Sequence, residues 1–293
     1  MSINVPQEYT NSINESMSAG GVSLPFSAPF IWWMNGNNQL KESDDARFFG
    51  GWATARESLE EYMAGSSTEN PPAQFALVDL VNKAGETIPN YISRTVYAAP
   101  IGRRKRWVTS RYNQDKKRSH VQILVYTAQF NREQKIYEPY GPAVLTAKGL
   151  SGSALETALE TWERATLAAR ATHTDPLVSA WFFYAPLGTF GAEPNVKMVG
   201  TGSNSSPITP CKVVVPEQEI TLQMLEKWFV GENVAAVMAD YKDQADDWLH
   251  AWDNWSDDDE DPQPQQQRQP QQQRQQAPPA PAPTEWGSDQ IPF

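Results

Sequence analysis

The sequence predicts a mainly β (α+β) protein, an OB-fold-like barrel that carries inserted and appended helices and ends in a disordered C-terminal tail. Short runs of β-branched and aromatic residues recur between Gly, Pro and Asn, later segments have apolar residues at helical spacing, and residues 254–293 are poor in large apolar side chains. With 40% apolar residues, the 293-residue chain has enough material for a core. Counting strands does not distinguish an OB barrel from another small barrel or a sandwich.

The expected elements follow one another along the chain. Residues 1–23, rich in Ser, Asn and Gly, are predicted to form a mobile arm ahead of one ordered domain over 24–253. A hairpin turn is expected at 83–86. Strands are expected over 26–34, 46–53, 75–81, 88–98, 120–130, 143–147, 178–184 and 212–215.

Helices are predicted over 153–170, from Thr221 onward, and over 233–252. Ser153 is the expected N-cap of the first helix, and Glu156 completes a capping box. Tryptophans spaced by four and three residues favour a terminal helix that packs on the body: Trp248, Trp252 and Trp255.

Negative charge is concentrated near the C-terminus. Of the net charge of −11, residues 240–293 carry −9 and residues 1–239 only −2, so the overall acidity does not exclude nucleic-acid binding. The single cysteine, Cys211, excludes an intramolecular disulfide and a cysteine-cluster zinc site. The N-terminus lacks the pattern of a signal peptide and no apolar run is long enough to span a bilayer. A soluble intracellular protein is therefore expected.

A basic segment with interspersed aromatic residues is the first candidate for a binding surface. Eight of the 24 basic residues fall within 103–118, opposed only by Asp115. They are Arg103, Arg104, Lys105, Arg106, Arg111, Lys116, Lys117 and Arg118, and Trp107 and Tyr112 lie among them. Single-stranded DNA requires cations for its phosphates and flat aromatic surfaces for its unstacked bases. Nearby Pro, Gly, Ser and Asn residues predict that the segment is a long loop between two strands.

Four further aromatic residues are candidates for base stacking. Tyr91 and Tyr97 are an even number of positions apart, so a single strand over 88–98 would place both on one face. The adjacent Trp32 and Trp33 would point to opposite faces of their strand, so only one of them is expected in the core.

The chain ends in a tether with an apolar tip. An acidic run at 257–261 precedes a Pro/Gln-rich stretch that cannot bury a core, so 254–285 is predicted to be a disordered linker. The last segment, 286–293, joins an apolar side chain and the terminal carboxylate on one residue, which suits capture by a partner protein. Its candidate partner-binding residues are Asp289, Ile291, Pro292 and Phe293.

This tail resembles the C-terminus of bacterial and phage single-stranded DNA-binding proteins, whose acidic tip ends in Ile-Pro-Phe. The resemblance covers the tail only, and the body, longer than the short bacterial OB domain, fits a phage relative better. It implies a protein of the cytoplasm of a bacterial host cell that coats single-stranded DNA in replication, recombination or repair. It also implies that replication, recombination and repair proteins bind the tip.

Other functions are less well supported by the residues. The three histidines are far apart and no phosphate-binding Gly loop with its Lys is present, so we expect no enzyme, no cofactor and no metal site. A recombination mediator or adaptor that acts mainly through protein contacts is the first alternative. A metal-dependent nuclease is the second, with scattered carboxylates such as Asp79 and Glu86 as its candidates. Homo-oligomer formation and the preference for DNA or RNA are left open.

Overall fold

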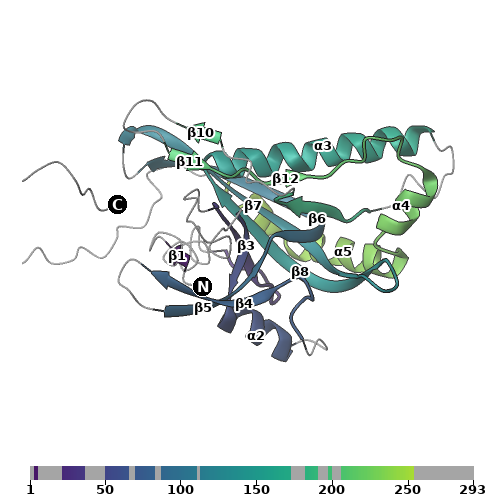
Figure 1. The fold of residues 1–293 in the computed structure, drawn as a ribbon, viewed down its shortest axis with the longest axis horizontal. Coiled ribbons are helices and arrows are strands. Elements are labelled where there is room, and N and C mark those ends of the chain that lie inside the picture. The colour runs from purple at the N-terminus through teal and green to yellow at the C-terminus, as the bar shows by residue number, and fades with distance from the viewer. Residues whose placement is uncertain are drawn as a thin grey trace, which may run out of the picture. The chain divides into compact units, whose positions relative to one another are not determined.

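The computed structural model describes residues 3–5, 22–36, 50–65, 70–82, 87–110, 113–172, 182–190, 197–199 and 206–253. The chain divides into two units, Met1–Asp259 and Glu260–Phe293, and the second lies outside the described residues. Every described helix and strand therefore belongs to the first unit (Figure 1).

One mixed, curled sheet forms the body of this unit (Figure 1). Within the described residues it contains ten strands, in the order β1-β4-β5-β3-β2-β8-β7-β6-β9-β12. The pairs β1–β4 and β2–β8 are parallel and the other pairs are antiparallel. The strands are β1 (Ile3–Val5), β2 (Phe30–Met34), β3 (Gly51–Ala55), β4 (Ala76–Asn82), β5 (Thr87–Ser93), β6 (Thr95–Ser110), β7 (Asn113–Asn131), β8 (Ile136–Lys148), β9 (Ala185–Gly188) and β12 (Lys212–Val213). A separate pair consists of β10 (Lys197–Val199) and β11 (Ser206–Ile208).

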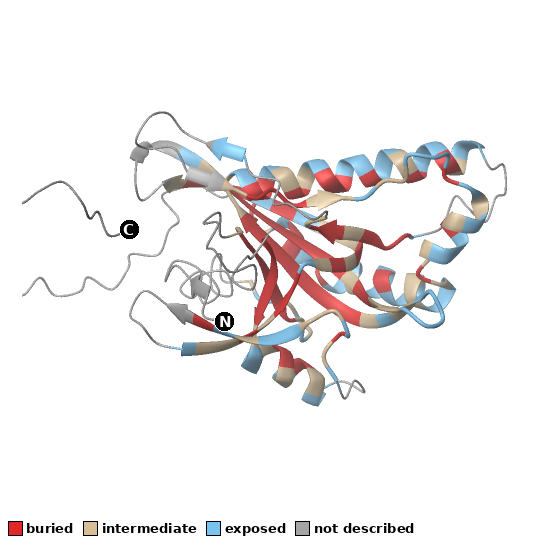
Figure 2. Cartoon of the chain, in the orientation of Figure 1, coloured by how far each residue is buried: buried red, intermediate tan, exposed pale blue. Residues whose placement is uncertain are grey.

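Helices lie on both faces of the sheet. The long α3 (Leu150–Thr172) packs on β7 and β8, whereas α5 (Glu232–Gln244) and α6 (Asp246–His250) pack against β6. The remaining helices are α2 (Arg56–Gly65), beside β3 and β5, and α4 (Leu222–Trp228), beside α3. Figure 2 shows the resulting pattern, in which buried residues fill the central strands and the inner sides of the helices.

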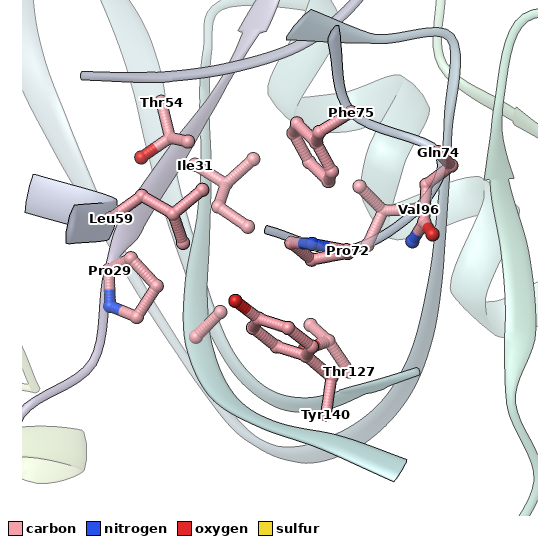
Figure 3. A pocket seen from close by; sticks show the side chains of 11 residues that line it. Pro29, Ile31, Thr54, Leu59, Pro72, Gln74, Phe75, Val96, Thr127 and Tyr140 are labelled. Atoms are coloured by element: carbon pink, nitrogen blue, oxygen red, sulfur yellow. The ribbon is translucent and has the colours of Figure 1, made fainter. Parts of the chain in front are cut away.

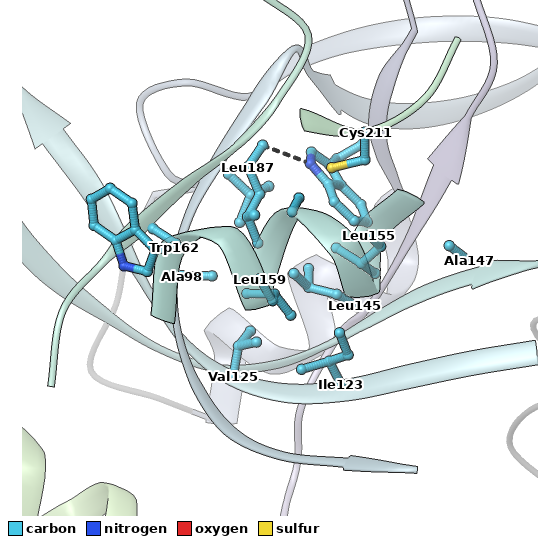
Figure 4. Packing of buried hydrophobic residues seen from close by; sticks show 14 of the residues in the cluster. Ala98, Ile123, Val125, Leu145, Ala147, Leu155, Leu159, Trp162, Leu187 and Cys211 are labelled. Atoms are coloured by element: carbon cyan, nitrogen blue, oxygen red, sulfur yellow. Dashed lines mark hydrogen bonds between the residues drawn. The ribbon is translucent and has the colours of Figure 1, made fainter. Parts of the chain in front are cut away.

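The core is divided by the alternation of side chains along the central strands. Under α3, Ile123 and Val125 of β7 pack with apolar residues of the helix (Figure 4). Val121 of the same strand belongs to this cluster too. On the other face, Leu124 packs with Trp248 from α6. Period-two alternation therefore supplies two apolar clusters from a single strand, and each fully buried aliphatic side chain contributes about 1.5 to 3 kcal/mol.

The predicted fold class is confirmed at the level of a mainly β, barrel-like sheet with helices added. The antiparallel pairing of β4 and β5 confirms the hairpin expected around 83–86, although the turn itself lies outside the described residues. Thr221 is confirmed as an N-cap, because its side chain accepts a hydrogen bond from Met224 N. Most of the expected strand 178–184 and part of 46–53 also lie outside the described residues.

Four details of the prediction are wrong. The basic segment is not a loop, because residues 103–110 belong to β6 and residues 113–118 to β7. Ser153 does not cap α3, which begins at Leu150. The helix expected over 233–252 is divided into α5 and α6. The strand expected over 88–98 is two strands, β5 and β6, that are not neighbours in the sheet.

Candidate nucleic-acid interface

The hairpin of β6 and β7 extends beyond the rest of the sheet as a two-stranded ribbon. The pairing of β7 with β8 ends at His120 opposite Lys148, and β9 pairs only with Thr95–Ala98 of β6. From Trp107 onward, β6 and β7 therefore pair only with each other among the described residues. A ribbon of this kind presents two faces and carries the predicted basic segment into a position where a ligand can approach.

One face of β6 and β7, which we call the exposed face, continues from the sheet onto the ribbon and consists of Arg103, Lys105, Trp107 and Lys117. Each of these residues is exposed, and the large indole of Trp107 is 52% exposed. The residues alternate with buried ones along β6, as expected for a strand with one covered side. Here cationic side chains and a flat aromatic surface lie side by side, the combination that single-stranded nucleic acid requires.

Two carboxylates of α3 partly balance the exposed face. Lys105 Nζ lies 2.7 Å from Glu156 Oε2, and Arg103 Nη1 lies 3.9 Å from Glu160 Oε1. The Lys105 ammonium is also 5.3 Å from the centroid of the Trp107 ring. The Arg103–Glu160 pair is solvent-exposed, and pairs of this type contribute about 0 to 1 kcal/mol, so a phosphate can replace Glu160 at little cost. The Lys105–Glu156 pair is partly buried, because the Glu156 side chain is only 16% exposed.

The opposite face of the ribbon's base is covered, and its arginines are internal. Arg104 is 3% exposed and Arg106 is 8% exposed. Arg104 donates to Gln122 Oε1 through Nε at 2.8 Å and Nη2 at 2.6 Å, and to the Trp248 carbonyl through Nη1 at 2.9 Å. Its guanidinium carbon lies 3.6 Å from the ring centroid of Trp248 and 4.1 Å from that of Trp252. These contacts replace water around a buried charge with indole faces and neutral oxygens.

Burial and charge shift the titration of this covered face. Burial, followed by the neighbouring Arg106, lowers the pKa of Arg104 to about 9, so the guanidinium still carries its charge at neutral pH. His120 is 1% exposed, and its Nε2 lies 3.0 Å from Thr146 Oγ1. Burial lowers the His120 pKa well below its ordinary value, with further lowering by nearby lysine and arginine side chains. The imidazole is therefore neutral at physiological pH.

The other predicted DNA-binding residues are dispersed. Trp32 is 4% exposed and Trp33 is 2% exposed, so both indoles are internal, contrary to the expectation that only one would be. Trp33 Nε1 donates to the Thr209 carbonyl at 2.9 Å, and the Trp33 ring contacts Trp52 edge-on at 5.0 Å. With Arg104 and Arg106, these two tryptophans are buried away from the exposed face, so they do not contact a strand that lies on that face.

The two predicted tyrosines do not share a surface. Tyr91 lies on β5 and Tyr97 on β6, separated in the sheet by β3, β2, β8 and β7. Both are half-buried, and Tyr97 packs against Phe130 and Tyr137. Arg118 is half-buried on the covered side of β7. Arg111, Tyr112, the Lys116 side chain and the tail residues Asp289, Ile291, Pro292 and Phe293 lie outside the described residues.

Sequence reasoning did not identify the residues that hold the covered face. Gln122, Trp248 and Trp252 surround Arg104, but they lie 18 to 148 positions away in the chain. One signal was present, the four-residue spacing of the two tryptophans, which predicted a helix packed on the body. Nothing in that spacing indicates that its partners are arginines.

A small cavity elsewhere offers no alternative site. It measures about 10 Å³ and is lined mainly by apolar residues of β2, α2, β6, β8 and residues 72–75, with Thr54, Gln74 and Thr127 as polar members of the lining (Figure 3). This volume is close to that needed for one water molecule. Among the residues that the structure describes, no group of three or more His, Cys, Asp or Glu side chains is arranged to hold a metal ion. No described helix has the length and apolar character needed to cross a membrane.

Comparison with known proteins adds no relative. No protein-family model, curated protein or solved structure matches the chain.

Proposed function

We propose that this protein binds single-stranded DNA without sequence preference through the exposed face of the β6–β7 ribbon. The observation that carries the proposal is the exposure of Trp107 between cationic side chains on a ribbon that extends beyond the sheet. Other large apolar side chains, such as Leu167 and Met198, are also exposed, and single exposed ones are normal on a protein surface. Trp107 differs in its setting, because it is an aromatic side chain that lies among lysines on this ribbon. Stacking on such an indole is available to any unpaired base, because every base has a π-face.

The chemistry of the exposed face favours an unpaired strand over a duplex. Duplex recognition needs fork-shaped donors directed at base edges in a groove. Here an arginine, a lysine and an indole follow one another on a single strand, so phosphates and unstacked bases are their natural ligands. The curled sheet also leaves an OB-like architecture open as part of the proposal, with the ribbon in the role of an extended hairpin.

The tail completes the proposed function. The terminal Phe293 and its carboxylate act as an anchor for a replication, recombination or repair protein, while the body coats the DNA. The tail sequence motivates this part of the proposal. The alternative, an adaptor that works mainly through protein contacts, predicts the same tail but no strand on the ribbon.

Titration with single- and double-stranded oligonucleotides at several salt concentrations tests this function. We expect quenching of tryptophan fluorescence by the single strand, tighter binding of it than of the duplex, and a linear fall of log affinity with log salt. Replacing Arg103 and Lys105 together with Gln should flatten that slope by about 0.7 for each phosphate that is no longer neutralised. If the single strand does not bind at low salt, the adaptor alternative is favoured. If the protein cleaves the single strand when a metal ion is added, the nuclease alternative is favoured.

A further inference from the structure

The covered side of the ribbon's base carries a cluster of positive groups that the proposed interface does not use. Arg106, His120 and Lys148 are direct cross-strand neighbours on β6, β7 and β8. Arg118 lies two residues before His120 on β7 and therefore on the same face. The three cationic side chains consequently lie around one neutral imidazole, and they lower its pKa further, after the larger effect of its burial.

Several buried hydrogen-bond donors lie within the same cluster. The Trp252 ring is 5.0 Å from the His120 ring and its centroid is 4.7 Å from the Arg106 guanidinium carbon. Four buried nitrogen atoms here have no hydrogen-bond partner among the residues that the structure describes: His120 Nδ1, Gln122 Nε2, Trp252 Nε1 and Arg118 Nε. The Thr146 hydroxyl can donate to His120 Nε2, and in that tautomer Nδ1 carries the proton and is a donor.

Buried donors without partners are costly and usually mark a missing acceptor. The acceptor that fits here is negatively charged, because the cluster contains three cations. Its oxygens must also point in several directions, since the donors come from β7 and from the segment after α6. A phosphate group has this shape, whereas a carboxylate offers two oxygens in one plane.

Access to the cluster is from its rim. Arg118 and Lys148 are half-buried, in contrast to the nearly inaccessible His120 and Trp252. Both rim residues lie where β7 leaves its pairing with β8 and continues into the ribbon. An anion that approaches the ribbon's base therefore meets the two flexible cations first.

We infer that Arg106, Arg118, His120 and Lys148, with Trp252 above them, form a phosphate-binding site. The phosphate is either a free phosphate group or a phosphodiester of a bound strand. The second source rests on the proposed function, and the first does not. In the second case a strand stacked on Trp107 continues around the edge of the ribbon onto its other face.

The first arm of the test uses inorganic phosphate, with ionic strength matched by sodium chloride. The ¹H–¹⁵N signal of the Trp252 indole should shift in a saturable manner, because its N–H gains an acceptor. Arg118→Gln and Lys148→Gln change rim residues and should each weaken phosphate binding by about tenfold, the loss expected for one charge-assisted hydrogen bond. Arg164→Gln and Lys227→Gln change exposed cations of α3 and α4 and serve as charge-matched controls with unchanged binding.

The second arm repeats the single-stranded DNA titration with the same four variants. If the site holds a phosphodiester, Arg118→Gln or Lys148→Gln flattens the salt slope by about 0.7 and the controls do not. If phosphate binding weakens but DNA binding does not change, or DNA does not bind at all, the site takes free phosphate. If the Trp252 signal does not respond to phosphate and the rim variants behave as the controls do in both arms, there is no phosphate site. That result would leave the DNA-binding proposal intact.

Discussion

Between Arg103 and Trp107, alternate residues of one basic segment point to the two faces of β6, and the two faces differ in their exposure to solvent. Arg103, Lys105 and Trp107 are exposed, whereas Arg104 and Arg106 are buried against Trp248 and Trp252. The difference teaches that a cluster of cations in a sequence is not a cationic surface. Arg104 and Arg106 pack against tryptophans in and just after α6, and only Arg103 and Lys105 remain for a ligand.

The same stacking chemistry operates on both faces. On the covered face, indoles of the protein lie over guanidinium groups at 3.6 to 4.7 Å. On the exposed face, an indole lies beside an ammonium and has one side in water. We propose that nucleic-acid bases stack on the exposed face, next to its cations, as the protein's own indoles stack on guanidinium groups on the covered face. Substitutions on each face and changes to the tail test this distinction, from the largest expected effect to the smallest.

Replacing Arg104 should affect stability far more than replacing Arg103. Arg104→Ala leaves Gln122 Oε1 without its two donors and opens a space between two indoles, so we expect a loss of about 2 to 4 kcal/mol in the free energy of unfolding. Arg103→Ala should change it by less than about 0.5 kcal/mol. Urea denaturation followed by far-UV circular dichroism measures both values. Equal effects of the two substitutions would remove the distinction between the faces.

The tail tip should act separately from both faces. Deleting Phe293 should weaken binding of a partner enzyme by about ten- to a hundredfold, since burying a Phe side chain contributes roughly 1.5 to 3 kcal/mol. DNA affinity should not change. Pull-down from a bacterial extract with intact and Phe293-deleted protein checks this. A third protein with one residue added after Phe293 keeps the side chain but moves the carboxylate, and it should lose the partner as well. Recovery of the same proteins in all cases would mean that the tip recruits nothing.

The covered face should make stability depend on pH. Because the His120 pKa is lower in the folded than in the unfolded protein, the unfolded state binds more protons as pH falls below about 6.5. His120 therefore contributes no pH dependence above that value, and stability declines by about 1.4 kcal/mol per pH unit below it. Denaturation curves at pH 7.0, 6.0 and 5.5 for wild type and His120→Gln measure this decline.

Only the difference between the two proteins reports on His120. A hydrogen bond to Asp253, with the charge of Asp246, raises the pKa of His250, an effect of opposite sign that both proteins share. The variant should lose the decline attributable to His120. An identical pH dependence in wild type and His120→Gln would show that this imidazole becomes charged without cost and is not enclosed by the cationic cluster.

Removing the acidic tail should have a smaller effect on the exposed face. Residues 257–293 contain seven acids and two bases, so their loss removes negative charge that competes electrostatically with DNA. Single-stranded DNA should bind the truncated protein more tightly at low salt, with the gain fading as the screening length shortens. Fluorescence anisotropy measures this affinity. Weaker binding after truncation would contradict the claim that the exposed face binds DNA without help from the tail.

Local patterns predicted the apolar strands and the long helix well. The predicted strand 75–81 overlaps β4 in all but its first residue, the predicted strand 120–130 lies within β7, and the helical spacing around Trp162 lies within α3. These elements were predictable because their own side chains fill the core. The helix α2 was missed, although Leu59 and Tyr62 have helical spacing and are buried.

The basic strands could not be predicted in the same way. Alternation of buried and exposed positions in Arg103–Arg106 is invisible in a sequence where every member is cationic. The burial of Arg104 depends on Trp248, 144 positions later, which no local pattern connects to it. Long-range packing thus decided both which arginines are internal and which part of the candidate site is open.

The most direct test of the account is the affinity of Trp107→Ala for single-stranded DNA. Loss of one stacking surface of about 1 to 3 kcal/mol per base should weaken binding by about five- to a hundredfold, while the free energy of unfolding stays nearly constant because Trp107 is half exposed. Trp107→Phe should retain most of the affinity. If the alanine variant is folded and binds the strand as wild type does, the exposed face is not where this protein holds DNA.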